Sequence, residues 1–130
     1  MEVHHVGYLV KRLEKAAAAF SALGYQAEGE AVWDPGRDVD ILFLTLGTCR
    51  VELVRPRSEK SVVAKLLRTY KNAPYHICYE TGDLAGDLAR LEEAGYLRID
   101  QPTPAPALGD RRVCFLMSPH AGMIELLESR

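Results

Sequence analysis

The stretch His5-Val6-Gly7-Tyr8 has a counterpart 71 positions later, His76-Ile77-Cys78-Tyr79. The same offset aligns Gly24 with Gly95, and each of these glycines is followed by a tyrosine. Self-similarity at a fixed offset indicates that one structural unit occurs more than once in a chain. The sequence therefore predicts two copies of a single unit, each opening with the histidine-containing segment.

A second match defines how far the two copies extend. Val51-Glu52-Leu53 aligns with Ile124-Glu125-Leu126, now at an offset of 73, so about two residues were gained in a loop between the matches. We predict a first repeat at about 1–56, a linker containing a short helix at about 57–73, and a second repeat at about 74–130.

Each repeat is expected to contain one strand, one helix and three further strands. The helices are amphipathic, the first is rich in alanine, and both stop at the glycines Gly24 and Gly95, as helices commonly do. Asp83 precedes the second helix as a candidate N-cap. The expected strands are 3–10, 25–32, 39–46 and 50–55 in the first repeat and 75–80, 96–101, 112–118 and 123–128 in the second, with helices at 13–23 and 84–94.

Composition narrows the class of protein. The chain has 130 residues, 48% of them hydrophobic, which is ordinary for one soluble globular domain. A formal net charge of −2 gives no basic footprint for nucleic acid or an anionic membrane, and no apolar run is long enough to span a bilayer. With no signal-peptide pattern and three scattered cysteines, we expect a cytoplasmic protein with reduced thiols.

Two glutamates and two histidines recur at equivalent positions of the repeats. Glu52 and Glu125 each lie in an otherwise apolar strand, and an ionised carboxylate is rarely buried without a partner. His5 and His76 lie in the first strand of each repeat. A single histidine or glutamate in a strand is more often a packing or surface residue, but the paired recurrence favours a divalent-metal site. Two imidazoles and two carboxylates suit zinc, nickel, cobalt, manganese or iron(II).

His4 and His5 are adjacent, so a strand directs them to opposite faces. The repeat pairs His5 with His76 and His4 with Tyr75, which makes His5 the predicted ligand and His4 a packing residue. Two positions beyond each predicted ligand is a small side chain, Gly7 or Cys78, which leaves room beside the imidazole.

Two βαβββ repeats in one chain resemble the vicinal oxygen chelate superfamily, which includes glyoxalases, bleomycin resistance proteins and dioxygenases. The resemblance covers essentially the whole chain and implies an α+β fold. In that fold the two repeats form a curved, cup-like mixed sheet with helices on the outside, as a single domain at 1–130. It also implies that His5, Glu52, His76 and Glu125 bind one divalent ion.

The segment VELVRPRSEKSVVAKLL, followed by YHICYE, is similar to the methylmalonyl-CoA epimerase pattern. The closing strand GMIELLE is similar to both epimerases and glyoxalase I. The resemblance implies a metal-dependent isomerase or lyase that moves a proton next to a carbonyl through a metal-stabilised enolate. The implied substrate is an acyl-CoA or a thiol adduct, and the implied assembly is a homodimer.

Glu125 is our first candidate for the general base, with Glu52 as its counterpart. Asp40 is a weaker candidate, because strand alternation sets it opposite Ile41 and Phe43, and an exposed strand carboxylate is the alternative reading. Three other functions stay open: a glyoxalase I-like lactoylglutathione lyase, a metal-free protein that binds small antibiotic-type molecules, and a ferrous dioxygenase. The last usually has two histidines and only one carboxylate.

Overall fold

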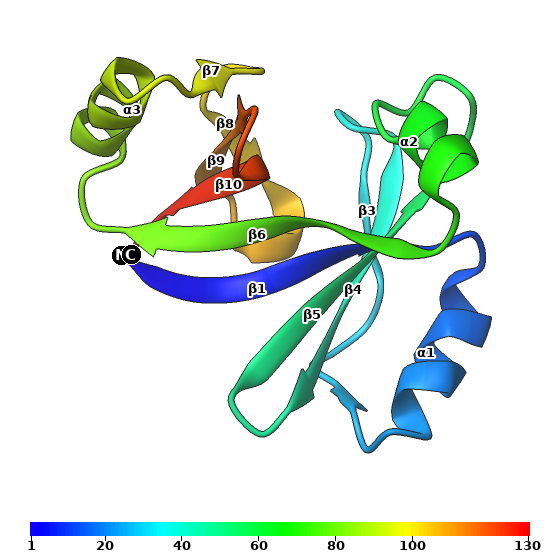
Figure 1. Ribbon diagram of the computed structural model, residues 1–130. Coiled ribbons are helices and arrows are strands. Elements are labelled where there is room, and N and C mark those ends of the chain that lie inside the picture. The colour runs from blue at the N-terminus through cyan, green and yellow to red at the C-terminus, as the bar shows by residue number, and fades with distance from the viewer. The chain divides into compact units, whose positions relative to one another are not determined.

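The computed structural model describes all residues from Met1 to Arg130 and contains ten strands and three α-helices (Figure 1). The chain divides into two compact units. One comprises residues 5–75, and the other comprises residues 1–4 together with 76–130. These boundaries lie close to those of the two sequence repeats.

The first unit follows the predicted βαβββ order. Its mixed sheet is built on β4, which pairs antiparallel with β5, while β5 pairs parallel with β1. Two short strands, β2 and β3, both pair antiparallel with β4. The elements are β1 (Glu2–Leu9), α1 (Leu13–Ser21), β2 (Gln26–Ala27), β3 (Val32–Asp34), β4 (Val39–Leu46), β5 (Cys49–Pro56) and α2 (Ala64–Tyr70).

Helix α1 covers one face of this sheet and contacts β4 and β5 (Figure 1). Tyr8, which alternates with the buried His5 and Leu9 along β1, packs under the helix against Phe20, with ring centroids 5.1 Å apart. Helix α1 does not cover the opposite face of the same strands, so a functional site can lie on that face. The buried members of this core are Val10, Leu13, Leu44, Val51 and Leu53.

The second unit repeats the same architecture. Strand β10 pairs antiparallel with β9 and parallel with β6, and the short strands β7 and β8 pair with β9. The elements are β6 (Ala73–Thr81), α3 (Leu84–Glu93), β7 (Leu97–Arg98), β8 (Thr103–Ala105), a 3₁₀ turn (Pro106–Leu108), β9 (Arg111–Ser118) and β10 (Gly122–Glu128).

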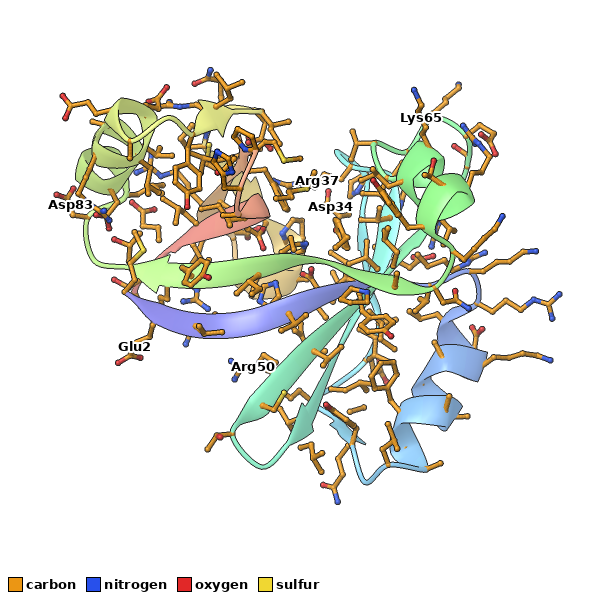
Figure 2. All side chains as sticks on the ribbon, in the orientation of Figure 1. Glu2, Asp34, Arg37, Arg50, Lys65 and Asp83 are labelled. Atoms are coloured by element: carbon orange, nitrogen blue, oxygen red, sulfur yellow. The ribbon has the colours of Figure 1, made fainter.

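Helix α3 begins where the sequence predicted. Asp83, labelled in Figure 2, accepts a hydrogen bond at 3.0 Å from the backbone N–H of Gly86, which confirms it as the N-cap. The apolar face of the helix then packs on one face of the sheet, together with Tyr79. The buried residues of this core are Leu84, Leu88, Leu91, Cys114, Leu116, Ile124 and Leu126.

Two of the predicted strands are wrong in extent. The segment 25–32 forms β2 and the start of β3, separated by Gly29, whose positive φ of 149° interrupts extended pairing. The segment 96–101 shortens to β7, because the N–H of Phe115 donates to the Asp100 side chain at 2.8 Å and not to a backbone carbonyl that would continue the ladder. Helix α1 also ends two residues early, at Ser21. The α+β class and the βαβββ order of both repeats are confirmed.

None of the helices is long and apolar enough to cross a membrane.

Candidate metal centre

In the first unit, His5 and Glu52 come together on the face of the sheet opposite α1. Parallel pairing of β1 with β5 places Gly7 directly beside Glu52, and His5 projects from the same face two residues earlier. The His5 Nε2 atom lies 3.4 Å from the Glu52 Oε1 atom. Both side chains are buried, with no more than 6% of either exposed.

The second unit repeats this arrangement. Parallel pairing of β6 with β10 places Cys78 beside Glu125, and His76 is two residues earlier on the same face. The His76 Nε2 atom lies 3.1 Å from the Glu125 Oε1 atom, and both side chains are again buried. In each repeat, a histidine and a glutamate that are far apart in the sequence thus lie side by side.

An aromatic ring completes each pair. Phe43 is opposite Glu52 in the β4–β5 ladder, and its ring lies edge-on to His5 with centroids 5.2 Å apart. Sequence reasoning assigned this phenylalanine no role. The signal that could have found it is the repeat itself, because an offset of 72 aligns Phe43 with Phe115 of the second repeat, which occupies the equivalent place.

The donor chemistry of each pair fits half of a divalent-metal site. Each pair contributes one imidazole nitrogen and one carboxylate oxygen, and both side chains of each pair are buried. Burying a carboxylate is costly without a partner, and an imidazole or a cation meets that need. Gly7 and Cys78, the small residues beside the two glutamates, add no bulk there.

His4 differs from His5 in its burial. His4 is half-buried, whereas its neighbour His5 is almost completely buried. His4 and Tyr75 both have interaction partners of their own, so neither is an idle side chain.

Asp40 lies on the opposite face of β4 from Phe43, and therefore from Glu52. Its partner across the ladder is Arg55, whose guanidinium donates a hydrogen bond to it at 2.8 Å. Arg57 donates to both carboxylate oxygens at 3.0 and 3.1 Å. Asp40 thus forms a structural ion-pair cluster with two arginines, away from the histidine–glutamate pair.

A further buried carboxylate, Asp34, was missed at the sequence level because its Asp-Pro-Gly context reads as a turn. It ends β3 opposite Val39 and shares a face with Glu52. Arg37 donates to it from its backbone N–H at 3.1 Å and from its guanidinium at 2.7 Å, and Figure 2 shows the two side by side.

Comparison with known proteins agrees with this architecture. Residues 4–115 match the family described as Glyoxalase/Bleomycin resistance protein/Dioxygenase superfamily. An ethylmalonyl-CoA/methylmalonyl-CoA epimerase of Cereibacter sphaeroides is 33% identical over 88% of this chain and 86% of its own length. The mitochondrial methylmalonyl-CoA epimerase of Homo sapiens is 31% identical over 95% of this chain and 72% of its own.

A solved structure extends the likeness of fold. It is a variant of the Streptomyces coelicolor methylmalonyl-CoA epimerase in complex with 2-nitronate-propionyl-CoA. It superposes with a TM-score of 0.85 at 22% identity, covering 99% of this chain and 94% of that chain. The repeats, the paired histidines and glutamates and these matches lead to one conclusion: the chain belongs to the glyoxalase/bleomycin resistance/dioxygenase superfamily.

Proposed function

We propose that this protein is an acyl-CoA epimerase of the methylmalonyl-CoA type. The observation that carries the proposal is the repeated, buried histidine–glutamate pair, present once in each half of a chain related to such epimerases. A carbon next to a thioester carbonyl is acidic enough for proton removal when a general base is close and the developing negative charge is stabilised.

We propose further that both pairs bind one divalent ion. His5 and Glu52 would contribute two ligands from the first repeat, and His76 and Glu125 would contribute two from the second. When bound, such an ion supplies Lewis-acid stabilisation of the negative charge that develops on substrate oxygen. Zinc, nickel, cobalt, manganese and iron(II) all accept this set of nitrogen and oxygen donors.

The two glutamates are the proposed acid and base. Epimerisation removes the proton from one face of the acidic carbon and delivers a proton to the other face, so it needs two proton-carrying groups. Glu125 would accept the first proton as a carboxylate, and Glu52 in protonated form would deliver the second. Burial and the neighbouring imidazoles favour this role, because burial limits the access of water and the imidazole contact restricts the orientation of each carboxylate.

Two measurements test the proposal. First, protein purified without chelators is analysed for metal content, and we expect one equivalent of a divalent ion per chain. Second, the enzyme is incubated in D₂O with methylmalonyl-CoA, and we expect deuterium at the carbon between the two carbonyls. A parallel reaction with a 2-oxoaldehyde–thiol adduct tests the lyase alternative.

The outcomes separate the possible functions. Deuterium uptake into the acyl-CoA alone supports an epimerase, and turnover of the thiol adduct alone replaces it with a glyoxalase-like lyase. If the protein contains no metal and binds small molecules tightly without deuterium uptake or turnover, both the epimerase and the lyase hypotheses are overturned. Light scattering on the same sample tests the homodimer that the family resemblance implies.

A further inference from the structure

Both repeats have a histidine, a glutamate and a phenylalanine on the same face of the sheet, but the side chains beside this set differ between them. In both, the row beside the histidine runs from a phenylalanine to a glutamate across paired strands. The neighbouring row, one step further along the strands on the same face, is polar in the first repeat and apolar in the second. This contrast can be read residue by residue, because the repeat supplies the equivalent positions.

In the second repeat this row consists of Leu97, Met117 and Met123. Ile99 adjoins it from the row of Phe115, and these four residues together form an apolar strip. Leu97 pairs with Met117 in the β7–β9 ladder, and Met117 pairs with Met123 in the β9–β10 ladder. The backbone N–H of Ile99 donates to the Phe115 carbonyl at 2.8 Å, which continues the β7 pairing by one step. Strand alternation therefore puts all four side chains on one face of the sheet.

The strip starts beside the proposed catalytic carboxylate and is open to solvent. Met123 is two residues from Glu125 on β10, which is about 7 Å along the strand on the same face. Leu97 is 71% exposed, Ile99 is 51% exposed and Met117 is 37% exposed. Large apolar side chains that gather on one exposed surface commonly mark a binding site.

The equivalent row of the first repeat has the opposite character. Offsets of 71 to 73 match the strip with Gln26, Glu28, Thr45 and Arg50. The backbone is the same, since the Glu28 N–H donates to the Phe43 carbonyl at 2.9 Å, as Ile99 does to Phe115. However, the Arg50 Nε atom lies 2.6 Å from a Glu28 carboxylate oxygen, so an ion pair occupies the place of the apolar strip. Arg50 is labelled in Figure 2.

We propose that the apolar strip binds the uncharged arm that links the thioester of an acyl-CoA to its nucleotide. The strip contains no charged side chain, so it suits a chain of methylene and amide groups and does not suit phosphates. By docking the arm on the second repeat, it directs the acyl group toward Glu125 of that repeat. This inference rests on the proposed function.

A second copy of this chain is the rival occupant, because β7 is an edge strand and exposed apolar edges favour pairing between molecules. The same row in the first repeat argues against a general edge effect, since β2 occupies the equivalent edge and is polar. The two occupants predict different effects of mutation, on ligand affinity or on oligomeric state.

The test exchanges strip residues for their counterparts. The variants Leu97→Gln and Met117→Thr are compared with the reverse exchange Thr45→Met in the first repeat. Calorimetry measures binding of an unreactive thioether analogue of methylmalonyl-CoA and of a short analogue that lacks the arm. We expect the two strip variants to lose about tenfold in affinity for the full analogue, the amount typical of removing apolar contacts. Affinity for the short analogue, and all binding by Thr45→Met, should be unchanged.

Equal losses for both analogues, or no loss, would overturn the inference while leaving the proposed function in place. A change from dimer to monomer in the strip variants, measured by light scattering, would assign the strip to a second copy. If the unaltered protein binds neither analogue, both the inference and the acyl-CoA function fail. Metal content and circular dichroism of each variant verify that the fold is retained.

Discussion

Phe115 faces Glu125 across the β9–β10 ladder, and its ring lies 5.1 Å from the imidazole of His76 at an interplanar angle of 85°. Phe43 holds the corresponding place in the first repeat, 5.2 Å from His5 at 73°. An edge-on ring restricts rotation of the imidazole without offering it a competing polar atom. The phenylalanines therefore act as positioning residues for the two histidines.

Replacing Phe115 by leucine should loosen His76 while leaving the core largely filled. We expect unfolding in urea to require about 1 kcal/mol less, and metal affinity to fall about tenfold, as when a ligand loses its supporting contact. Competition with a chelator measures the affinity. The matched control is Phe20→Leu, which changes a ring on α1 that packs against Tyr8 and Tyr25 and should cost stability without changing metal affinity.

The adjacent histidines offer a sharp test of the ligand assignment. His5→Ala should abolish stoichiometric metal binding, because it removes an imidazole donor from the buried pair with Glu52. His4→Ala should retain the metal, because His4 projects to the other face of the same strand. Elemental analysis of the purified variants measures both. Equal metal content in the two proteins would refute the assignment.

Glu125→Gln preserves the shape of the side chain but removes its ability to accept a proton. We expect deuterium exchange into methylmalonyl-CoA to fall by about 10² to 10⁴, the usual contribution of a general base. Glu52→Gln should slow conversion between the epimers by a similar factor. A Glu125→Gln protein that binds metal and exchanges at the normal rate would exclude this residue as the base.

The three cysteines should differ strongly in reactivity. Cys49 is exposed, whereas Cys78 and Cys114 are buried. Burial raises the pKa of the Cys114 thiol to about 12, so at pH 8 it stays protonated and is a poor nucleophile. We expect Ellman's reagent to titrate one thiol rapidly in the folded protein and the other two only after unfolding. Cys49→Ser should remove the fast phase, and a fast phase that persists would contradict the burial of the others.

Asp87 links the stability of α3 to pH. Its pKa is lowered by a hydrogen bond from the Thr81 hydroxyl and, to a smaller extent, by Arg90. A lowered pKa in the folded state means that the carboxylate stabilises the fold above its ordinary pKa of 3.8, and that this contribution is lost as the pH falls below that value.

We therefore expect Asp87→Asn to lose about 0.5–1 kcal/mol of unfolding free energy at pH 7, with the difference from the unaltered protein shrinking below pH 4. Urea titrations at several pH values measure it. Glu93→Gln, an exposed change in the same helix, is the control and should have little effect at any pH. A loss at pH 7 that persists unchanged in acid would show that the charge of Asp87 is not its cause.

The histidine–glutamate pair of each repeat was largely predictable because each of its residues recurs at an equivalent position of the other repeat. A lone His5 would be an ordinary strand residue, but its match to His76 at the same offset as Gly24 and Gly95 made the pairing visible. Alternation along the strands then assigned each residue a face. The buried histidine–glutamate pairs agree with that assignment within each repeat.

Other features depended on information that alternation does not contain. Phe43 and Phe115 meet the histidines because of the register between neighbouring strands, which hydrophobic patterning leaves open. Asp40 forms hydrogen bonds with Arg55 on the next strand and with Arg57 just after that strand, and alternation along β4 does not predict these partners. Cross-strand partners are properties of the assembled sheet, and the sequence alone does not rank them.

Parallel pairing of the first and last long strands of each repeat has a kinetic consequence. His76 and Glu125 are separated by 49 positions, and the parallel ladder that unites them can close only after the intervening helix and strands have collapsed. Contacts of such long sequence separation form late and slowly, because loop closure must precede the favourable energy. A metal ion with these ligands would recognise only chains that have completed a whole repeat, so its uptake should mark the end of folding and leave earlier intermediates untouched.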